Sequence, residues 1–208
     1  MKSVVLGENL IVPTKILCIG RNYVEHIHEL GNEIPEDMVV FLKPNSAIST
    51  VLHSEHQGET LHYETELCFM FQNGRFSSVA VGLDLTKRDL QTKLKAKGLP
   101  WERAKAFDGA ALFSPFVAID DAEAQLHFTL SINDNLVQEG HIDLMIYKPQ
   151  TILSELQAFI SLDEGDIVMT GTPKGVGSIP AKSVFNVTLS RGLQASAEPL
   201  LEWQWLSV

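Results

Sequence analysis

The sequence predicts a mixed, β-rich α+β fold. Strand-like apolar runs outnumber the amphipathic helical stretches, and short turns join several neighbouring strands into hairpins. This pattern favours an antiparallel or mixed sheet with a few helices over a doubly wound α/β sheet. No repeat, low-complexity tract or long linker interrupts the chain of 208 residues, so we expect one domain over residues 1–208.

The N-terminal part predicts a strand, a helix and a second strand. The run "KILCIG" (15–20) is a short apolar strand that ends at a glycine. The next stretch, "RNYVEHIHEL" (21–30), has apolar residues spaced for one buried helix face and ends before Gly31. The run "MVVFLKP" (38–44) is a strand closed by a proline.

A period of two governs residues 61–71, "LHYETELCFMF". Alternate residues of a strand point to opposite faces, which predicts two sets of side chains. One face carries His62, Glu64, Glu66, Cys68 and Met70, and the other carries Tyr63, Thr65, Leu67, Phe69 and Phe71.

The next strand is predicted over residues 78–85, "SVAVGLDL", after a turn at Asn73-Gly74. Asp84 lies at the end of this strand, just before the helix "KRDLQTKLKAKG" (87–98). Thr86 and Asp89 have the spacing of a variant capping box for that helix.

The C-terminal half predicts a hairpin, a helix and three further strands. The hairpin covers residues 126–140 with its turn near Asn133–Asn135, and an amphipathic helix follows over residues 150–162. The strands are predicted in "DIVMTG" (166–171), "SVFNVTLS" (183–190) and "LLEWQWL" (200–206).

The charge and cysteine content limit the function classes. A formal net charge of −10 argues against nucleic-acid or anionic-membrane binding, and it requires any anionic substrate to meet locally concentrated positive charge. Cys18 and Cys68 lie in apolar runs without metal-ligand spacing, so we expect two buried free thiols. The N-terminus has no signal-peptide pattern, and no stretch approaches a membrane span, which predicts a cytoplasmic protein.

Three carboxylates form the first candidate site. Glu64 and Glu66 share a strand face, and Asp84 can approach them if the two strands pair as a hairpin. Such a set of oxygens suits Mg²⁺ or Mn²⁺. Alternating glutamates are also common on a solvent-facing edge strand, and the spacing by itself favours this interpretation.

Other candidate residues are open to two interpretations. His26 and Glu29 are neighbours on one helix side and could form a general base, but such pairs are also common on exposed helices, and His28 is equally available. The loop "GTPKGVG" (171–177) lacks the phosphate-binding spacing and is typical of a tight turn, although its backbone N–H groups could hold a carboxylate. The basic residues Arg21, Lys43 and Lys105 occur beside apolar stretches, where the simpler expectation is a stem lying on the surface.

Taken together, the motifs resemble the fumarylacetoacetate hydrolase family, and its small acylpyruvase-like and oxaloacetate decarboxylase-like branch. The likeness covers roughly residues 15–180 in collinear order. The motifs that carry it are "CIGRNYVEHIHELGN", "VVFLKP", "HYETEL", "GLDLTKRDLQ", "KGLPWERAKAFD" and "EGDIVMTGTPKGVG".

The resemblance implies a β-sandwich roll, usually a homodimer, with a defined set of site residues. Glu64, Glu66 and Asp84 match the family's ligands for Mg²⁺ or Mn²⁺. His26, Glu29 and Lys105 match its catalytic residues. The positions that line the pocket or hold the substrate carboxylate are Arg21, Asn22, Lys43, Gln91 and Thr172.

The chain departs from the family pattern in two places. The segment between "HYETEL" and "GLDLT" is shorter than in relatives. After the hairpin, relatives often have threonine where this chain has Ile142, and the flanking His141 and Asp143 are unusual. These departures concern the pocket wall, a dimer surface and the substrate preference.

The resemblance implies an enzyme that acts on a small 2-oxo acid. We expect a metal-dependent hydrolase that cleaves the C–C bond of acylpyruvates such as fumarylpyruvate, giving pyruvate and a carboxylic acid. Within the family the alternatives are an oxaloacetate decarboxylase and an isomerase of a 2-hydroxymuconate-type diacid. A protein that binds the metal and a 2-oxo acid without turnover is the alternative of a different class.

Overall fold

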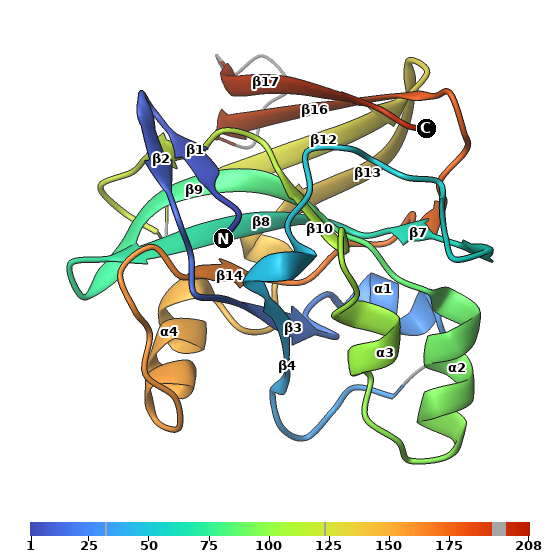
Figure 1. Ribbon diagram of the computed structural model, residues 1–208. Helices are drawn as coiled ribbons and strands as arrows, with labels where there is room; N and C mark the ends of the chain where they lie inside the picture. The colour runs from blue at the N-terminus through green and yellow to red at the C-terminus, as the bar shows by residue number, and fades with distance from the viewer. Residues whose placement is uncertain (32, 123, 193–198) are drawn as a thin grey trace.

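Two β-sheets pack face to face in the computed structural model, which describes residues 1–31, 33–122, 124–192 and 199–208 (Figure 1). The larger sheet is mixed, because β3 and β14 run parallel and its other neighbours run antiparallel. Its strand order is β10-β9-β8-β14-β3-β4, with β11 paired to β9. These strands are β3 (Lys15–Gly20), β4 (Val39–Pro44), β8 (Thr65–Gln72), β9 (Arg75–Asp84), β10 (Ala111–Phe113), β11 (Val117–Ala118) and β14 (Ile167–Met169).

The smaller sheet is antiparallel and has the order β13-β12-β16-β17. It consists of β12 (Leu126–Ile132), β13 (Asn135–His141), β16 (Val184–Arg191) and β17 (Pro199–Leu206). Three two-stranded pairs complete the strands: β1 (Val4–Leu6) with β2 (Asn9–Ile11), β5 (Glu55–His56) with β6 (Glu59–Thr60), and β7 (His62–Tyr63) with β15 (Gly177–Ser178). The predicted β-rich α+β class and its sandwich form are therefore confirmed.

The helices lie around the larger sheet. In Figure 1, α1, α2 and α3 are grouped beside the ends of β3 and β4, and α4 lies on the opposite side. Within the described ranges, no helix is long and apolar enough to cross a membrane. The α-helices are α1 (Val24–Glu29), α2 (Arg88–Ala96), α3 (Glu102–Lys105) and α4 (Pro149–Gln157), and short 3-10 helices occur at Asn45–Ala47 and Ile142–Leu144.

The alternation in β8 sorts side chains into two apolar clusters. Leu67, Phe69 and Phe71 pack between the two sheets with residues of β12 and β16. Cys68 and Met70 pack on the other face, with Cys18 and other residues of β3 and β14. Both faces of β8 are thus buried, and the two cysteines are buried free thiols as expected.

Four local predictions needed correction. The first helix begins at Val24 and not at Arg21, because Arg21 has φ of 56°, outside the helical region. The predicted strand 61–71 is interrupted at Glu64 between β7 and β8. The helix predicted to residue 162 ends at Gln157, and Phe159, expected on its buried face, is 63% exposed.

The predicted capping box at Thr86 and Asp89 is also wrong. Lys87 is the N-cap residue of α2, and no side chain caps this terminus. The Oγ1 atom of Thr86 instead accepts a hydrogen bond from Nζ of Lys105 at 2.6 Å. A buried ammonium group therefore uses the hydroxyl that the spacing had assigned to the helix.

Candidate metal centre and active site

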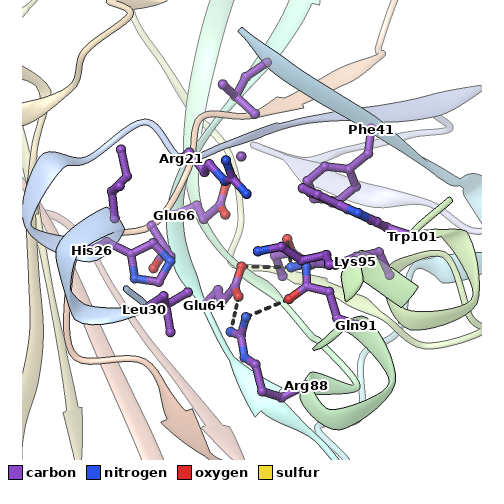
Figure 2. Close-up of a pocket in the computed structure, with 16 residues that line it drawn as sticks. Arg21, His26, Leu30, Phe41, Glu64, Glu66, Arg88, Gln91, Lys95 and Trp101 are labelled. Carbon is purple, nitrogen blue, oxygen red and sulfur yellow. Dashed lines mark hydrogen bonds and ion pairs between the residues drawn. The ribbon is translucent and has the colours of Figure 1, made fainter. Parts of the chain in front are cut away.

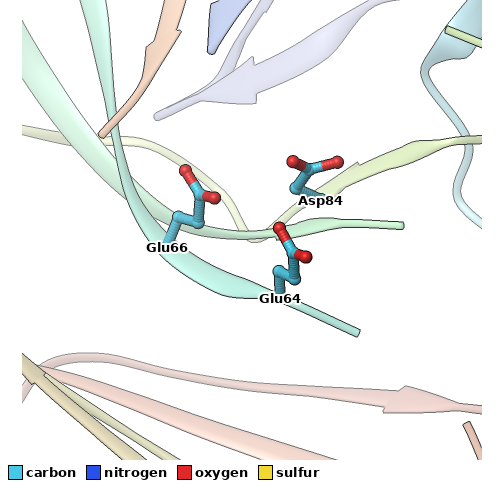
Figure 3. A group of neighbouring side chains, drawn as sticks. All are labelled: Glu64, Glu66 and Asp84. Carbon is cyan, nitrogen blue, oxygen red and sulfur yellow. The ribbon is translucent and has the colours of Figure 1, made fainter. Parts of the chain in front are cut away.

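Three buried carboxylates meet where β8 and β9 pair. The antiparallel register places Glu66 opposite Gly82, and the backbone N–H of Asp84 donates to the carbonyl of Glu64 at 2.8 Å. The carboxylates of Glu64, Glu66 and Asp84 each offer an oxygen within 4.8 Å of the other two (Figure 3). These residues are 7%, 2% and 1% exposed, respectively, and β8 is an interior strand, so the edge-strand interpretation of the glutamates is wrong.

Cations from α2 and α3 neutralise one side of this cluster. Nζ of Lys105, from α3, lies 2.8 Å from Oε2 of Glu64 and 2.7 Å from Oδ2 of Asp84. Arg88, from α2, pairs with Oε1 of Glu64. Burial alone would raise the pKa of Glu64, but the charges of Lys105 and Arg88 outweigh it and hold that pKa well below its usual range.

The carboxylate of Glu66 is buried beside the two other negative charges of the cluster. Burial, followed by the negative charges of Asp84 and Glu64, raises the pKa of Glu66 well above its usual range, although the N–H of Gly171 donates to its Oε2 at 2.7 Å. An additional cation beside Glu66 would relieve this repulsion.

Asp84 also keeps an acceptor without a donor. Nζ of Lys43 lies 2.8 Å from its Oδ1, but this contact lacks hydrogen-bond geometry. The ammonium of Lys43 instead donates to the backbone carbonyls of Leu85, Lys105 and Ala110, which use its three N–H groups. Oδ1 of Asp84 consequently receives no hydrogen bond from the residues that the structure describes.

The donor set of this cluster fits a hard divalent cation. Its three carboxylates supply only oxygen ligands, which Mg²⁺ and Mn²⁺ prefer. Oδ1 of Asp84 receives no hydrogen bond from the described residues, and acidic neighbours help to raise the pKa of Glu66, so a further cation would stabilise the cluster. The structure therefore supports the predicted ligand set on its geometry and its charge.

A histidine–glutamate pair lies on α1, and its histidine lines the same cavity as the carboxylates. The spacing of three residues puts His26 and Glu29 on one helix side, where Nδ1 of His26 lies 3.0 Å from Oε2 of Glu29. The other carboxylate oxygen of Glu29 accepts the N–H of Gly175 at 2.9 Å. Since Glu29 occupies Nδ1, the remaining ring nitrogen, Nε2, is the atom available for proton transfer. His28, the alternative candidate, is exposed.

The loop 171–177 holds carboxylates of the protein itself. Gly171 donates its N–H to Glu66, and Gly175 donates its N–H to Glu29. The loop is thus not a nucleotide site but a backbone support for one residue of the cluster and one of the pair.

The predicted pocket residues divide into two groups. Arg21, Gln91 and Thr172 line the cavity together with the carboxylates and His26 (Figure 2). Asn22 and Lys43 lie behind it and are fully buried. Lys43 binds backbone carbonyls and lies 2.8 Å from Oδ1 of Asp84, and Asn22 binds backbone groups of Thr170 and Tyr147. The expectation that Arg21, Lys43 and Lys105 lie on the surface is wrong for the two lysines, which are 0% and 2% exposed.

The sequence analysis missed several cavity residues. Figure 2 shows Arg88 bonded to Glu64 and Gln91, and Lys95 near Trp101. Nζ of Lys95 lies 5.6 Å from the centroid of the Trp101 ring. Arg88 and Lys95 lie three residues before and four residues after the predicted Gln91, so helical periodicity could have placed both on the same face as that residue. Phe41 and Leu30 complete the apolar wall.

The cavity is lined by cations as well as by the acidic cluster. Arg21, Arg88 and Lys95 are among its lining residues, and Arg88 is paired with Glu64. Burial, followed by the charges of Arg21 and Arg88, lowers the pKa of Lys95, which shows how closely the cations gather. A cavity of this kind suits an anion that also binds a metal ion.

The unusual residues after the hairpin lie outside this cavity. Ile142 is buried in the core between the sheets. His141 and Asp143 line a separate hollow at the end of β13, where the N–H of Asp143 donates to Nδ1 of His141 at 3.0 Å. Neither residue therefore lines the cavity that contains the carboxylates.

Known proteins match this chain over most of its length. The family model described as fumarylacetoacetate (FAA) hydrolase C-terminal matches residues 15–199. An oxaloacetate tautomerase of Escherichia coli (strain K12) is 34% identical over 192 residues, which cover 84% of this chain and 88% of the relative.

Solved structures of similar proteins have the same fold. A fumarylacetoacetate isomerase/hydrolase-type protein from Oleispira antarctica superimposes with a TM-score of 0.91 at 31% identity, covering 100% of both chains. A fumarylpyruvate hydrolase from Pseudomonas aeruginosa, crystallised with Mn²⁺ and pyruvate, gives a TM-score of 0.85 at 27% identity, covering 99% of this chain and 95% of that one.

Proposed function

The chain belongs to the fumarylacetoacetate hydrolase family, and from this premise we propose that it is a divalent-metal-dependent enzyme acting on small 2-oxo acids. The best-supported reaction is the interconversion of the enol and keto forms of oxaloacetate. One observation carries the proposal: a single cavity is lined by three carboxylates suited to a metal ion, by the histidine of the histidine–glutamate pair and by a group of cations. The similarity to an oxaloacetate tautomerase supports the choice of substrate.

The acidic and basic residues that line the cavity complement the functional groups of oxaloacetate. Glu64, Glu66 and Asp84 would hold Mg²⁺ or Mn²⁺ beside the α-keto carboxylate. When bound, the ion supplies positive charge that favours ionisation of a 2-oxo acid at the carbon next to its carbonyl. Arg21 and Lys95 supply positive charge for the distal carboxylate of oxaloacetate. A substrate with only one carboxylate would not make use of this charge.

His26 is the group that moves the proton. Tautomerisation transfers a proton between the enol oxygen and the neighbouring carbon, so one base that takes and returns a proton is sufficient. Glu29 orients the ring through Nδ1, which leaves Nε2 for the substrate. Burial disfavours the charged form of Lys105, but Asp84 and Glu64 outweigh this and raise its pKa, so this ammonium contributes charge and not a base.

The test follows the enol form of oxaloacetate by its ultraviolet absorbance. With protein and Mn²⁺ present, we expect the enol to disappear faster than with Mn²⁺ alone. Addition of a chelator should remove the acceleration. An enol decay no faster than that of the Mn²⁺ control would overturn the proposal.

Hydrolysis of an acylpyruvate is the second candidate, and the His26–Glu29 pair favours it because such a pair can activate water. A panel of acylpyruvates, fumarylpyruvate and oxaloacetate, incubated with Mn²⁺ and assayed for pyruvate, separates the reactions. We expect His26→Ala to slow hydrolysis about 10²–10⁴-fold. It should affect oxaloacetate decarboxylation less, since loss of CO₂ requires no attacking water. Equal losses in both reactions would contradict the water-activating role.

The same panel addresses the remaining alternatives. Conversion of a 2-hydroxymuconate-type diacid without pyruvate release would indicate an isomerase. Measurable Mn²⁺ binding with no conversion of any compound would favour a binding protein. The homodimer and the cytoplasmic location stay predictions, and light scattering on the purified protein would test the first of them.

A further inference from the structure

A short segment after β14 contacts both halves of the candidate site. We call residues 170–175 the strap. Its first residue, Thr170, is fixed to β8 because its N–H and Oγ1 both donate to the carbonyl of Leu67, at 3.1 and 2.9 Å. Gly171 then donates to Glu66 of the acidic cluster, and Gly175 donates to Glu29 of the histidine–glutamate pair. The position of the strap therefore affects the cluster and the pair together.

The strap is packed so closely that it needs glycine at two positions. Gly171 and Gly175 have φ of 98° and 97°, in the region that favours glycine. A Cβ atom on Gly171 would lie 2.8 Å from Cβ of Asn22, and one on Gly175 would lie 2.1 Å from the carbonyl oxygen of Val137. The backbone of the strap is thus in close contact with Asn22 and Val137, and its position depends on these neighbours.

Two buried amide side chains hold the strap, one at its first residue and one in its middle. Nδ2 of Asn22 donates to the carbonyl of Thr170 at 2.8 Å. Nε2 of Gln138, from β13, donates to Oγ1 of Thr172 at 2.9 Å and to the carbonyl of Pro173 at 3.0 Å. Asn22 and Gln138 are 0% and 2% exposed.

Gln138 also contacts the strand that carries the two glutamates. Its Oε1 accepts the backbone N–H of Thr65 at 3.1 Å, and Thr65 lies between Glu64 and Glu66. The interruption of the predicted strand at Glu64 occurs next to this residue. One side chain therefore links β8, at the acidic cluster, to the strap that supports Glu66 and Glu29.

We propose that Gln138 is a positioning residue that, through the strap, aligns the acidic cluster and the His26–Glu29 pair for the reaction proposed above. The role requires an amide, because one atom must accept from Thr65 and the other must donate to the strap. A glutamate at this position keeps the acceptor and the size of the side chain but loses the donor. The proposal rests on the proposed function for its catalytic part only, since metal affinity is measured without a substrate.

The first experiment compares Gln138→Glu with Gln204→Glu, an exposed control on β17 that adds the same charge. Thermal unfolding establishes that each variant folds, and calorimetric titration with Mn²⁺ alone gives the metal affinity. For Gln138→Glu we expect the Kd for Mn²⁺ to rise about tenfold or more, as when a group that orients a metal ligand is lost. We expect kcat to fall by a similar factor with KM little changed, and the control to match the wild type.

The second experiment uses Gly175→Ala, which acts at the end of the strap that supports Glu29, since the added Cβ would meet the carbonyl oxygen of Val137 and lie 3.2 Å from Cγ of Gln138. We expect kcat to fall by a larger factor than the Mn²⁺ affinity, because the support of Glu66 is at Gly171. This variant also tests the proposal if Gln138→Glu does not fold.

Two results would overturn the role of Gln138 and the strap. One is a folded Gln138→Glu protein whose Mn²⁺ affinity and kcat both stay within twofold of the wild type. The other is a Gly175→Ala protein with unchanged turnover. If no substrate in the panel is converted even by the wild type, the proposed function fails, and the Mn²⁺ titration of Gln138→Glu still decides whether Gln138 positions the cluster.

Discussion

The protein buries carboxylates in two regions, which differ in how many hydrogen-bond donors each carboxylate receives. Asp166, next to β14, is 0% exposed and accepts hydrogen bonds from the backbone N–H groups of Thr14, Lys15 and Asp163 and from the side chains of Thr14 and Lys15. Both of its oxygens are therefore used. In the acidic cluster, three carboxylates share few donors, and Oδ1 of Asp84 has none among the described residues.

The pKa directions of the two regions agree with this contrast. Burial would raise the pKa of Asp166, but its hydrogen bonds with Lys15, Asp163 and Thr14 outweigh burial and lower it. The pKa of Glu66 is raised instead, by burial and by its acidic neighbours. A buried carboxylate with a structural role is saturated with donors, whereas the cluster leaves acceptor capacity for a ligand. Replacing each acid by its amide tests this difference.

The largest effect is expected for Glu66→Gln. The amide removes one negative charge and a ligand, so Mn²⁺ affinity and metal-dependent turnover should fall by more than about 100-fold, beyond the loss seen when an outer-shell partner is removed. Metal-free stability should not fall, because the amide can still accept from Gly171 and now donates towards acidic neighbours. Urea unfolding without metal and Mn²⁺ titration measure both quantities. A metal-free Glu66→Gln protein less stable than the metal-free wild type would contradict the claim that Glu66 is repelled by its acidic neighbours.

The matched change Asp166→Asn should have the opposite result. The new NH₂ group would face two donors, Nζ of Lys15 and the N–H of Asp163, in place of the oxygen that accepts from them. We expect the free energy of unfolding to fall by about 1.5–3 kcal/mol, the range for hydrogen bonds to a charged group. Mn²⁺ affinity should be unchanged. Weakened metal binding in a folded Asp166→Asn protein would mean that the two regions are coupled.

The pH dependence of stability should also distinguish the wild type from Asp166→Asn. The folded pKa of Asp166 lies below its unfolded value, so its contribution is present above the unfolded pKa of about 3.9 and is lost as pH falls through the folded pKa. Below about pH 4 the wild type should therefore lose stability faster than Asp166→Asn. Urea unfolding at a series of pH values measures this, and parallel curves would contradict the assignment.

The smallest effect is expected for Thr14→Ala. This change removes one side-chain donor to Asp166, at 2.8 Å, and leaves the backbone donors in place. We expect a loss of about 1 kcal/mol in the free energy of unfolding, typical of a single hydrogen bond. A loss as large as that of Asp166→Asn would show that the stabilisation of this carboxylate is not distributed among its several donors.

Local patterns in the sequence predicted much of the fold. The period of two correctly assigned the two faces of β8, and the turn residues correctly placed the hairpin β12–β13, where Asn133 and Asp134 have positive φ. Helix boundaries were less accurate. The helix α1 begins only after Arg21, whose left-handed backbone conformation the local sequence pattern does not show.

The candidate site was predictable only with the family motifs. The spacing of Glu64 and Glu66 by itself was better explained by an exposed strand, and that of His26 and Glu29 by a surface helix. Asn22 and Lys43 were expected to contact substrate, but their polar atoms hold backbone groups behind the cavity. Gln138 was not singled out at all, since nothing in its strand pattern shows that it is buried against the strap.

The sequence by itself determined which side chains share a face, because the periods of strands and helices are local properties of the chain. It therefore determined that Glu64 and Glu66 point the same way and that His26 can reach Glu29. Only the tertiary structure decided that these faces are buried and meet in one cavity. Burial and charge pairing depend on residues far along the chain, such as Gly171, which lies 105 positions from the Glu66 carboxylate to which it donates.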